Sequence, residues 1–446
     1  MTSLQRIGPF ALGLALQVAS AAVPVHAAAV DANAVLWVTQ LRDSGPGSLR
    51  AALATANARA GLDHIRFAPD LAGTLPVSGG PLMIRDALRI DGTRRQRIRL
   101  RGNAVDSLFE VTADAVEVSL RDLVLTDAGN SAIVNRGATL IVEDCTLRGN
   151  RGRRGGGIDS QGGWLSLNRT TIRDNLAEAL GDDDGRGGGI HAIDTTIRLE
   201  ASRISSNHAD ALGGGLYVEI ADPDVLFVRG SLIDSNIAAT QGGGAFVHAR
   251  DRTISGFINS TLSGNRSARD AALWFDGGLV INSSTISDNI SLPAETAGIC
   301  AGLCGAGDRT ELWLNSTLMS GNRDVHGNGH DLSAMAGPVH VAHSLIERIA
   351  DGAIDDGRGH NLLNVAARLG PLARRGGMLP VHALAADSPA IDAGSNPSLL
   401  QHDQRGPCHA RVVGAAPDIG AHEHDGTSGA TERPDRRRRC LPSRPR

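Results

Sequence analysis

The chain has 446 residues, of which 55 are glycine and only 3% are aromatic, and its formal net charge at pH 7 is −4. This length allows two or three globular domains, but a repeat protein can run as far in one unit because each repeat contacts only its neighbours. A net acidic chain without aromatic residues interleaved among basic ones argues against a nucleic-acid partner. All 44 basic residues are arginine, which is typical of a GC-rich bacterial genome.

The first 28 residues have the three zones of a secretory signal peptide. Arg6 precedes an apolar stretch from 10 to 22, and small residues flank Val25-His26-Ala27 near a cleavage site. The apolar stretch is shorter than the roughly 20 residues that a membrane span needs, and no later stretch approaches that length. The sequence therefore predicts an exported protein without a transmembrane segment.

Residues 29–64 are predicted to form an N-terminal cap that contains one short helix. Ser48 can cap a helix that runs to about Ala60, with Leu49 and Leu53 on one face, and Gly61 follows it. We expect this helix to cover the exposed core of the first repeat. Short apolar runs between residues 65 and 125 are typical of strands in early, less regular repeats.

One phrase occurs seven times between residues 140 and 322. An apolar strand is followed by Ser, Thr or Cys five residues before an Asn, by Ile, Leu or Met three residues before it, and then by the Asn. The repeated asparagines are Asn150, Asn175, Asn207, Asn236, Asn265, Asn289 and Asn322. Their separations of 24 to 33 residues indicate a solenoid.

The spacing within each repeat predicts short strands joined by bends. An apolar residue stands eight residues before every Asn and ten before six of the seven, which is strand alternation. Glycine runs such as Gly155-Gly156-Gly157 allow a sharp turn or close packing before a second apolar segment. The predicted fold class is all-β, a right-handed parallel β-helix over residues 65–377. Equivalent asparagines would then stack at one corner and hydrogen-bond along the helix axis.

The cysteines receive two interpretations. Cys145 occupies the column that the other six repeats fill with Ser or Thr, so we interpret it as a small buried residue. Cys300 and Cys304 are close enough in sequence to form a local disulfide after export. A metal site at this pair is the weaker alternative, because no second ligand pair has matching spacing.

The pattern loosens after Asn322. Residues 378–424 are rich in Pro, Gly and Asp and are expected to form an irregular C-terminal segment. Residues 425–446, which include Arg436-Arg-Arg-Arg-Cys440, are expected to be a disordered basic tail.

Three parts of the chain resemble a group of secreted bacterial proteins. They are Val38-Thr-Gln-Leu-Arg-Asp-Ser-Gly-Pro-Gly-Ser-Leu-Arg-Ala-Ala52, the Gly-Gly-Gly-Ile and Ile-x-x-Asn repeats, and Asp387-Ser-Pro-Ala-Ile-Asp-Ala-Gly394 with Asp403-Gln-Arg-Gly406 and Pro417-Asp-Ile-Gly-Ala-His-Glu423. The chain is similar to choice-of-anchor Q domain proteins, whose repeats resemble those of chlamydial polymorphic outer-membrane proteins. In the latter a Phe stands where this chain has Ile, Leu or Met. The resemblance implies a secreted or surface-exposed right-handed β-helix, in a group mostly without an assigned reaction, and it leaves the means of attachment open.

The same scaffold carries polysaccharide lyases and glycoside hydrolases, so the loops could hold residues for their chemistry. Hydrolysis needs paired carboxylates, and lyase chemistry needs a base beside carboxylates that hold a divalent cation. The densest acidic run is Asp182-Asp183-Asp184, in a loop that is longer than its counterparts in other repeats. It is either a calcium site or a solvated turn, and consecutive carboxylates seldom converge on one ion. No cofactor other than calcium is suggested.

A second candidate is the column that directly follows the repeated Asn. It holds Arg151, Arg266 and Arg323 in three repeats and His208 in a fourth. Cations spaced along one face of the stack could contact an acidic polysaccharide. Ordinary solvent exposure is the alternative, because the other three repeats place Leu176, Ile237 and Ile290 there.

Histidines also occur in glycine-rich bends and near the C-terminus. His330 and His360 each follow a Gly-x-Gly sequence, which turn chemistry explains. The run from His422 to Asp425 is dense in metal-ligand types, but it belongs to the family-like end segment, where packing or capping is expected.

Taken together, the residues favour an exported, monomeric binding or adhesion scaffold at the bacterial cell surface or in the extracellular space. Its expected partners are glycans or other cell-surface molecules, and a Gram-negative envelope is the expected location. One alternative is a polysaccharide lyase or glycoside hydrolase that uses Asp183, Asp184, His208 and Arg266 in a groove along the helix. A second alternative is a purely structural envelope protein, which the low aromatic content favours.

Overall fold

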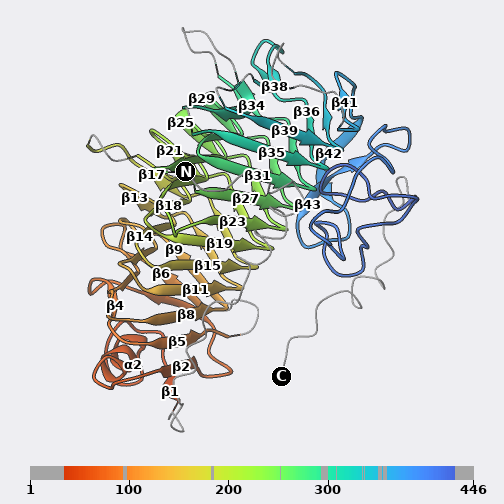
Figure 1. The fold of residues 1–446 in the computed structure, drawn as a ribbon. Helices are drawn as coiled ribbons and strands as arrows, with labels where there is room; N and C mark the ends of the chain where they lie inside the picture. Colours follow the sequence, from red (N-terminus) through yellow and green to blue (C-terminus); the bar gives the residue numbers. More distant parts are fainter. Residues whose placement is uncertain are drawn as a thin grey trace, which may run out of the picture.

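The structure, a computed structural model, describes residues 35–426 except 94–97, 182–184, 252, 293–299, 308, 334, 336, 350–353 and 355–358. The predicted signal peptide and almost all of the predicted basic tail lie outside these residues. The described chain winds into stacked coils that form a parallel β-helix (Figure 1). This confirms the predicted fold class. No helix among the described residues is long and apolar enough to cross a membrane.

A regular coil passes through four sheets in a fixed order, which we name A, B, D and C. One coil contains β11 (Thr139–Glu143) in sheet A, β12 (Thr146–Arg148) in sheet B, β13 (Arg151–Gly152) in sheet D and β14 (Ile158–Gln161) in sheet C. The chain then returns to sheet A in β15 (Trp164–Asn168), one coil further along the axis. Every strand pairing between coils is parallel.

The strands of each sheet follow one another along the helix axis. Sheet A continues with β1 (Leu36–Val38), β2 (Asp63–Phe67), β5 (Leu88–Asp91), β8 (Glu117–Arg121), β19 (Thr196–Glu200), β23 (Leu226–Arg229), β27 (Ile254–Ile258), β31 (Gly278–Asn282), β35 (Glu311–Asn315) and β39 (Val339–Ala342). Sheet B continues with β3 (Gly73–Pro76), β6 (Ile98–Arg101), β9 (Leu123–Thr126), β16 (Thr171–Arg173), β20 (Arg203–Ser205), β24 (Leu232–Asp234), β28 (Thr261–Ser263), β32 (Thr285–Ser287), β36 (Leu318–Ser320), β40 (Leu345–Ile346) and β41 (Leu362–Leu363).

Sheets C and D complete the coils on the other sides. Sheet C continues with β4 (Leu82–Ile84), β7 (Phe109–Val111), β10 (Ile133–Asn135), β18 (Ile190–Ile193), β22 (Leu216–Ile220), β26 (Ala245–Ala249), β30 (Leu273–Asp276), β34 (Cys300–Gly305) and β38 (His330–Leu332). The shorter sheet D continues with β17 (Leu176–Ala177), β21 (His208–Ala209), β25 (Ile237–Gln241), β29 (Arg266–Arg269), β33 (Ile290–Ser291) and β37 (Arg323–Asp324).

The core is a set of aliphatic columns inside the coils. In sheet A, Leu140, Leu165, Ile197 and Leu226 lie in register on neighbouring strands, and all four are fully buried. The next residue of each strand points outward, as strand alternation requires. A single coil buries little apolar surface, so each depends on its neighbours for stability.

The repeated asparagines form a hydrogen-bonded ladder at the corner between sheets B and D. Asn207 illustrates the pattern, because its backbone N–H and its Nδ2 both donate to Oδ1 of Asn236, at 3.0 and 2.9 Å. Its Nδ2 also donates to the backbone oxygen of Ile172 in the preceding coil. The same bonds link all seven asparagines, from Asn150 to Asn322.

The small polar column lies at the corner between sheets A and B. The backbone N–H of Thr170 donates to Oγ of Ser202, and Ser202, Ser231 and Ser260 continue the series. Cys145 is buried and unoxidised in this column. The residue before each member has a left-handed backbone, which turns the chain sharply. These corner residues are Asp144, Arg169, Ala201, Gly230, Asn259, Ser283 and Ser316.

The glycine runs lie where the chain passes from sheet D into sheet C. The first glycine of a run, such as Gly187, has a left-handed backbone with φ of 68°. A Cβ on the second, Gly188, would stand 2.3 Å from the backbone oxygen of His208. Glycine is required there because neighbouring coils approach at backbone distance.

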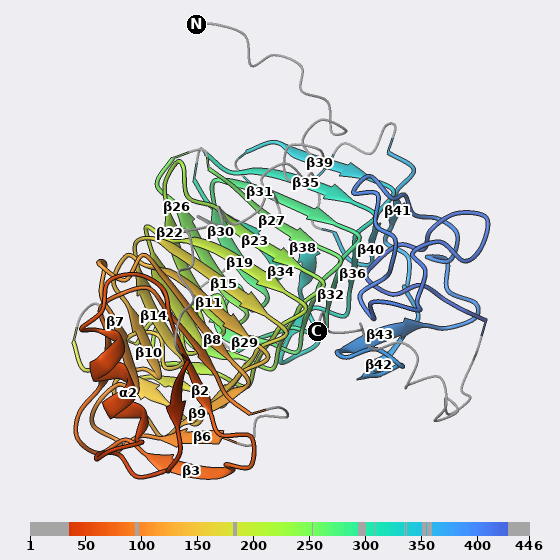
Figure 2. The ribbon, with the colours of Figure 1, turned by 90° about the horizontal axis from the view of Figure 1, so that it is seen from below.

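The helix α2 (Leu49–Ala56) covers the first end of the stack (Figure 2). Ser48 caps it by accepting a hydrogen bond from the backbone N–H of Ala51, and Leu49 and Leu53 are buried in the main core. The helix ends four residues earlier than the sequence predicted. The stack also begins earlier than residue 65, because β1 already pairs with β2. An apolar run of three residues is too short for periodicity to reveal.

The C-terminal segment, residues 365–426, packs against the side of the stack rather than its end (Figure 1). It starts with an antiparallel hairpin, β42 (Leu369–Arg374) and β43 (Pro380–Leu384), which begins before the predicted boundary at 378. Gln404 accepts a hydrogen bond from Thr261 and donates one to the backbone oxygen of Ser231. Leu400 covers the outward side chains of Phe227 and Val280. The strands β24, β28, β32 and β36 of sheet B are therefore buried on both faces.

Candidate functional site

The predicted column of cations lies in register on sheet D. Arg151, Leu176, His208, Ile237, Arg266, Ile290 and Arg323 are paired one after another along this sheet. His208 and Arg266, which the enzyme alternative combines, are separated by Ile237 on the intervening strand. The Nε2 atom of His208 lies 3.1 Å from a carboxylate oxygen of Asp210. These two candidate catalytic residues therefore do not converge on one point.

The predicted acidic loop, Asp182 to Asp184, lies outside the described residues. The bends with His330 and His360 have structural contacts. Asp331 directly follows His330. The backbone N–H and the Nδ2 of Asn322 both donate to Oδ1 of Asp331, at 3.1 and 2.6 Å. Asp331 therefore extends the asparagine ladder by one position. The ring of His360 stacks on His343. Both contacts belong to the stack.

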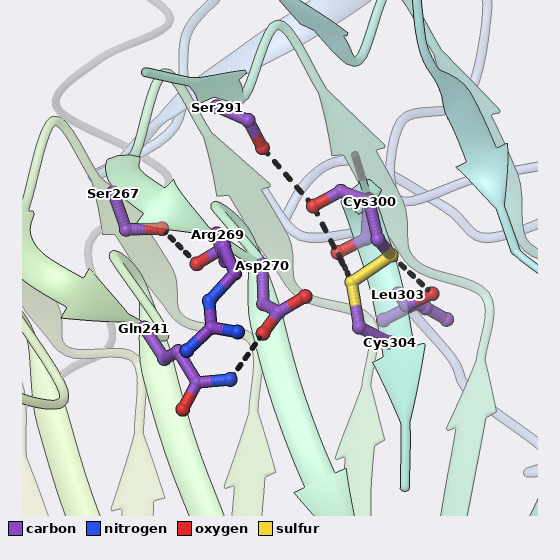
Figure 3. Close-up of a disulfide and its surroundings, with 9 residues drawn as sticks. Gln241, Ser267, Arg269, Asp270, Ser291, Cys300, Leu303 and Cys304 are labelled. Atoms are coloured by element: carbon purple, nitrogen blue, oxygen red, sulfur yellow. Dashed lines mark hydrogen bonds between the residues drawn. A yellow bond between two sulfur atoms is a disulfide. The ribbon is translucent and has the colours of Figure 1, made fainter. Parts of the chain in front are cut away.

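The disulfide joins Cys300 and Cys304 within β34 (Figure 3). The Asp270 carboxylate lies close to both sulfur atoms, and the ligand atoms of the three residues are within 4.8 Å of one another. Gln241 donates to this carboxylate at 2.8 Å, and burial raises the pKa of Asp270. Metal binding by cysteine needs thiolates, which a disulfide does not supply. The cluster is therefore not a metal site in its oxidised form.

An aromatic column stands on the outward side of sheet C. His191, Tyr217, Phe246 and Trp274 lie in register, with nearly parallel rings whose centroids are 5.2, 5.3 and 4.1 Å apart. Because the rings stack on one another, their faces are occupied within the column. The column therefore stabilises neighbouring coils and does not offer sugars an open aromatic face.

The cluster near the C-terminus is a buried ion network. The Arg405 guanidinium donates to Asp403 and Asp425 and to the backbone oxygen of Glu423, and the Arg405 side chain is only 3% exposed. Glu423 accepts hydrogen bonds from the backbone N–H groups of Val413 and Asp418, while burial raises its pKa to about 7. Burial holds the pKa of His422 well below its usual value. These residues hold the C-terminal segment together.

A cleft with a volume of about 610 Å³ lies between the C-terminal segment and the stack. One wall is the corner between sheets A and B, which presents Arg169 and Glu200. The other wall comes from Arg374, from Gly376 to Leu379 and from Gln404 to Pro407. A cleft of this size suits a small molecule or a short piece of a polymer.

The charged groups of the cleft are mostly engaged in ion pairs. Arg169 binds the carboxylates of Asp144 and Glu143, and this pairing raises its pKa. Arg405 is occupied by the buried network, and Glu200 lies 3.2 Å from Arg198. Arg374 is exposed and has no ion-pair partner among the described residues. It is the cation that a ligand can reach without breaking an existing contact.

The sequence alone did not predict this cleft, although Asp403 to Gly406 belong to the family-like end segment. The walls come from residues about 140 to 240 positions apart in the chain, and no periodic pattern connects such positions.

A smaller hollow of about 330 Å³ lies between the stack and the hairpin. It is lined by Asp288, Glu347 and Arg368, with Ser320 between the two carboxylates along the stack. Asp288 lies 3.8 Å from Arg323, and Ser320 donates a hydrogen bond to Glu347. Asp288 and Glu347 come from coils two apart, so about 9.6 Å of strand spacing separates their positions.

Comparisons with known proteins give one structural likeness. No family description matches the sequence, and no curated protein matches it. A solved structure, the "Crystal structure of pectate lyase Pel9A", covers 89% of this chain and 97% of its own, with 14% sequence identity and a TM-score of 0.48. Similarity at this level says nothing about activity.

Proposed function

We propose that this protein is an exported β-helix that binds an acidic glycan in the cleft without cleaving it. The observation that carries the proposal is the composition of the cleft, which combines one accessible cation with glycines and with apolar side chains such as Met378 and Pro407. Sugars present hydroxyl groups and C–H faces together, and an acidic sugar adds a carboxylate that Arg374 can pair with. The partner class predicted from the sequence is thereby narrowed to acidic glycans.

The lining argues for binding rather than catalysis. Glu200 is the single carboxylate among the described residues of the cleft wall. Glycoside hydrolysis uses two carboxylates that flank the scissile bond. A lyase needs carboxylates that hold a divalent cation beside a base. One carboxylate that is already paired with an arginine fits neither mechanism.

The place of action is supported by sequence alone. The three-zone N-terminus favours export, and the resemblance to choice-of-anchor Q domain proteins favours a cell-surface or extracellular location in a Gram-negative bacterium. A stack whose coils are covered on one side by the C-terminal segment leaves the other sides open to contact partners. We therefore place the protein outside the cytoplasm as a scaffold, and as a monomer.

Calorimetric titration with oligogalacturonate, with and without calcium, tests this proposal. We expect binding that weakens about tenfold in Arg374→Ala, because a charge-assisted hydrogen bond contributes about 1.5–3 kcal/mol. Arg375→Ala is the matched control, since this exposed neighbour does not line the cleft. A neutral oligosaccharide of the same length should bind more weakly. Equal losses in both variants, or no binding of any acidic glycan, would contradict the proposal.

One observation favours a second function, glycoside hydrolysis. The hollow is lined by Asp288 and Glu347, whose coils are two strand spacings, or about 9.6 Å, apart. This spacing is close to the roughly 6.5–9.5 Å that separates the two carboxyl groups of inverting enzymes. The same titrations should therefore be followed for reducing ends and for unsaturated products. Turnover that disappears in Glu347→Gln and in Asp288→Asn would establish hydrolysis in this hollow. Turnover that persists in both variants would exclude these carboxylates.

A further inference from the structure

Cationic and aliphatic residues alternate along the outward column of sheet D. In register order its residues are Arg151, Leu176, His208, Ile237, Arg266, Ile290 and Arg323. Cationic types and aliphatic residues alternate without exception along these seven coils. All seven side chains are at least partly exposed.

The alternation sets a distance between charges. Neighbouring parallel strands are about 4.8 Å apart, so cations on every second coil recur at about 9.6 Å. The four cationic positions together span six coil steps, or about 29 Å. The hydrogen-bonded strands hold the backbone rigidly. The distance between the backbone positions of the cations is therefore set by the strand spacing.

The charges remain accessible to a ligand. The Arg266 guanidinium is exposed and has no ion-pair or hydrogen-bond partner among the described residues. Arg151 lies 3.0 Å from Glu178, and both side chains are substantially exposed. Arg323 similarly faces an exposed Asp288 at 3.8 Å. Exposed pairs of this kind are weak, so a ligand anion can replace the carboxylate at little cost.

His208 differs from the three arginines. It carries a charge only when protonated, and Asp210 lies 3.1 Å from its Nε2 atom. Glu178 and Asp210 lower the positive potential along the first half of the column. Arg266 is thus the position where a bound anion should contribute most.

We propose that this column is a second binding surface, separate from the cleft, for a linear acidic polysaccharide whose acidic groups recur on one side at every second sugar. In an extended β-linked chain, successive sugars face opposite ways, and the repeat of two sugars is close to two strand spacings. Acidic groups would then meet the cations of alternate coils. The aliphatic residues between them would contact the C–H faces of the intervening sugars.

Hyaluronate oligosaccharides of increasing length provide the test, because they carry one carboxylate on every second sugar. Binding to the whole protein should strengthen with length until the oligosaccharide spans the column, at about seven sugars, and then level off. Arg266→Ala should weaken binding about threefold, and Arg266→Ala combined with Arg323→Ala about tenfold. Arg266→Lys should keep most of the affinity, since a cation remains.

Two controls separate spacing from general attraction. Arg99→Ala removes an exposed arginine from β6 in sheet B and should leave hyaluronate binding unchanged. Ile237→Arg fills the gap between His208 and Arg266 and should strengthen binding of polyphosphate, whose charges are closely spaced, more than binding of hyaluronate. Equal losses in Arg99→Ala and Arg266→Ala, or affinity that does not depend on length, would overturn the proposal.

The cleft is tested independently of this surface. Arg374→Ala should not alter hyaluronate binding to the sheet D column, and Arg266→Ala should not alter oligogalacturonate binding in the cleft. If either single variant lost binding of both hyaluronate and oligogalacturonate, the two sites would not be separate.

Discussion

At the scale of single residues, the end of the asparagine ladder shows why one position departs from the pattern. Each internal Asn accepts on Oδ1 and donates from Nδ2, so it can join two neighbours. The last position, Asp331, accepts on both sides, from Asn322 and from the backbone N–H of Arg348 at 2.8 Å. An amide there would place its Nδ2 donor against the donor of Arg348. A side chain with an oxygen on each side is therefore better suited to this end than an amide.

Replacing Asp331 tests this account and its pH dependence. Burial raises the folded pKa of Asp331 to about 6, above its ordinary value of 3.8. A carboxyl group with a raised pKa stabilises the fold most below about pH 4, and that contribution is lost as the pH rises to about 6. In urea denaturation, the stability advantage of the wild type over Asp331→Asn should therefore shrink by about 2 kcal/mol between pH 4 and 7. A stability difference between the wild type and Asp331→Asn that is the same at every pH would contradict a raised pKa for Asp331.

The sequence predicted the seven asparagines because they recur with the period of the coils. Asp331 could not be predicted, because it follows Asn322 by only nine residues and lies in a glycine-rich bend that is equally typical of a turn. The register of the cation column also followed from its constant offset from Asn. The roles of Asp182 to Asp184 stay a prediction, since these residues lie outside the described structure.

At the scale of elements, the C-terminal segment determines where the cleft is. It approaches the stack through contacts that span more than a hundred residues, such as Ser263 with His382 and Ser231 with Gln404. Its composition indicated an irregular segment but not its location. The sequence of sheet B does hold one signal of this location. Its outward positions are Arg148 and Arg173 in the early coils but Ser263 and Ser287 in the later ones. A charged outward row that becomes small and polar marks a covered surface.

Gln404 is the residue whose removal should loosen this element. In Gln404→Ala, the buried hydroxyl of Thr261 and the backbone oxygen of Ser231 lose their partner, at a cost of about 1–3 kcal/mol. Hydrogen exchange should accelerate in residues 365–426 while the coils keep their protection. Gln401→Ala, which changes an exposed residue of the same segment, should have no such effect. Uniform acceleration throughout the chain would show that the segment and the stack are one cooperative unit.

At the scale of the whole molecule, the two halves of the stack are unequally supported. The coils from β24 to β36 are covered by the C-terminal segment, whereas β6 and β12 of sheet B keep exposed or half-exposed outward residues. Long repeat arrays lose two-state cooperativity when their parts differ in stability. The early coils should therefore unfold at lower denaturant concentration than the covered ones.

Hydrogen exchange at increasing denaturant checks this expectation. Residues 63–126 should lose protection first and residues 226–320 last, because the C-terminal segment packs on the latter. The Gln404→Ala variant should narrow the difference by weakening the covered half. A single transition at one denaturant concentration for both halves would be incompatible with unequal support.

The C-terminal segment can dock only after the coils it contacts have folded. A coil needs only the preceding coil, 24 to 33 residues back, so the stack can grow in the order in which the chain emerges. The segment must instead find surfaces laid down as far back as Ser231, 173 residues before Gln404. The cleft thus forms last, when the chain is whole. A chain shortened at its C-terminus would be a folded rod without it, and ligand capture in the cleft would distinguish finished molecules from unfinished ones.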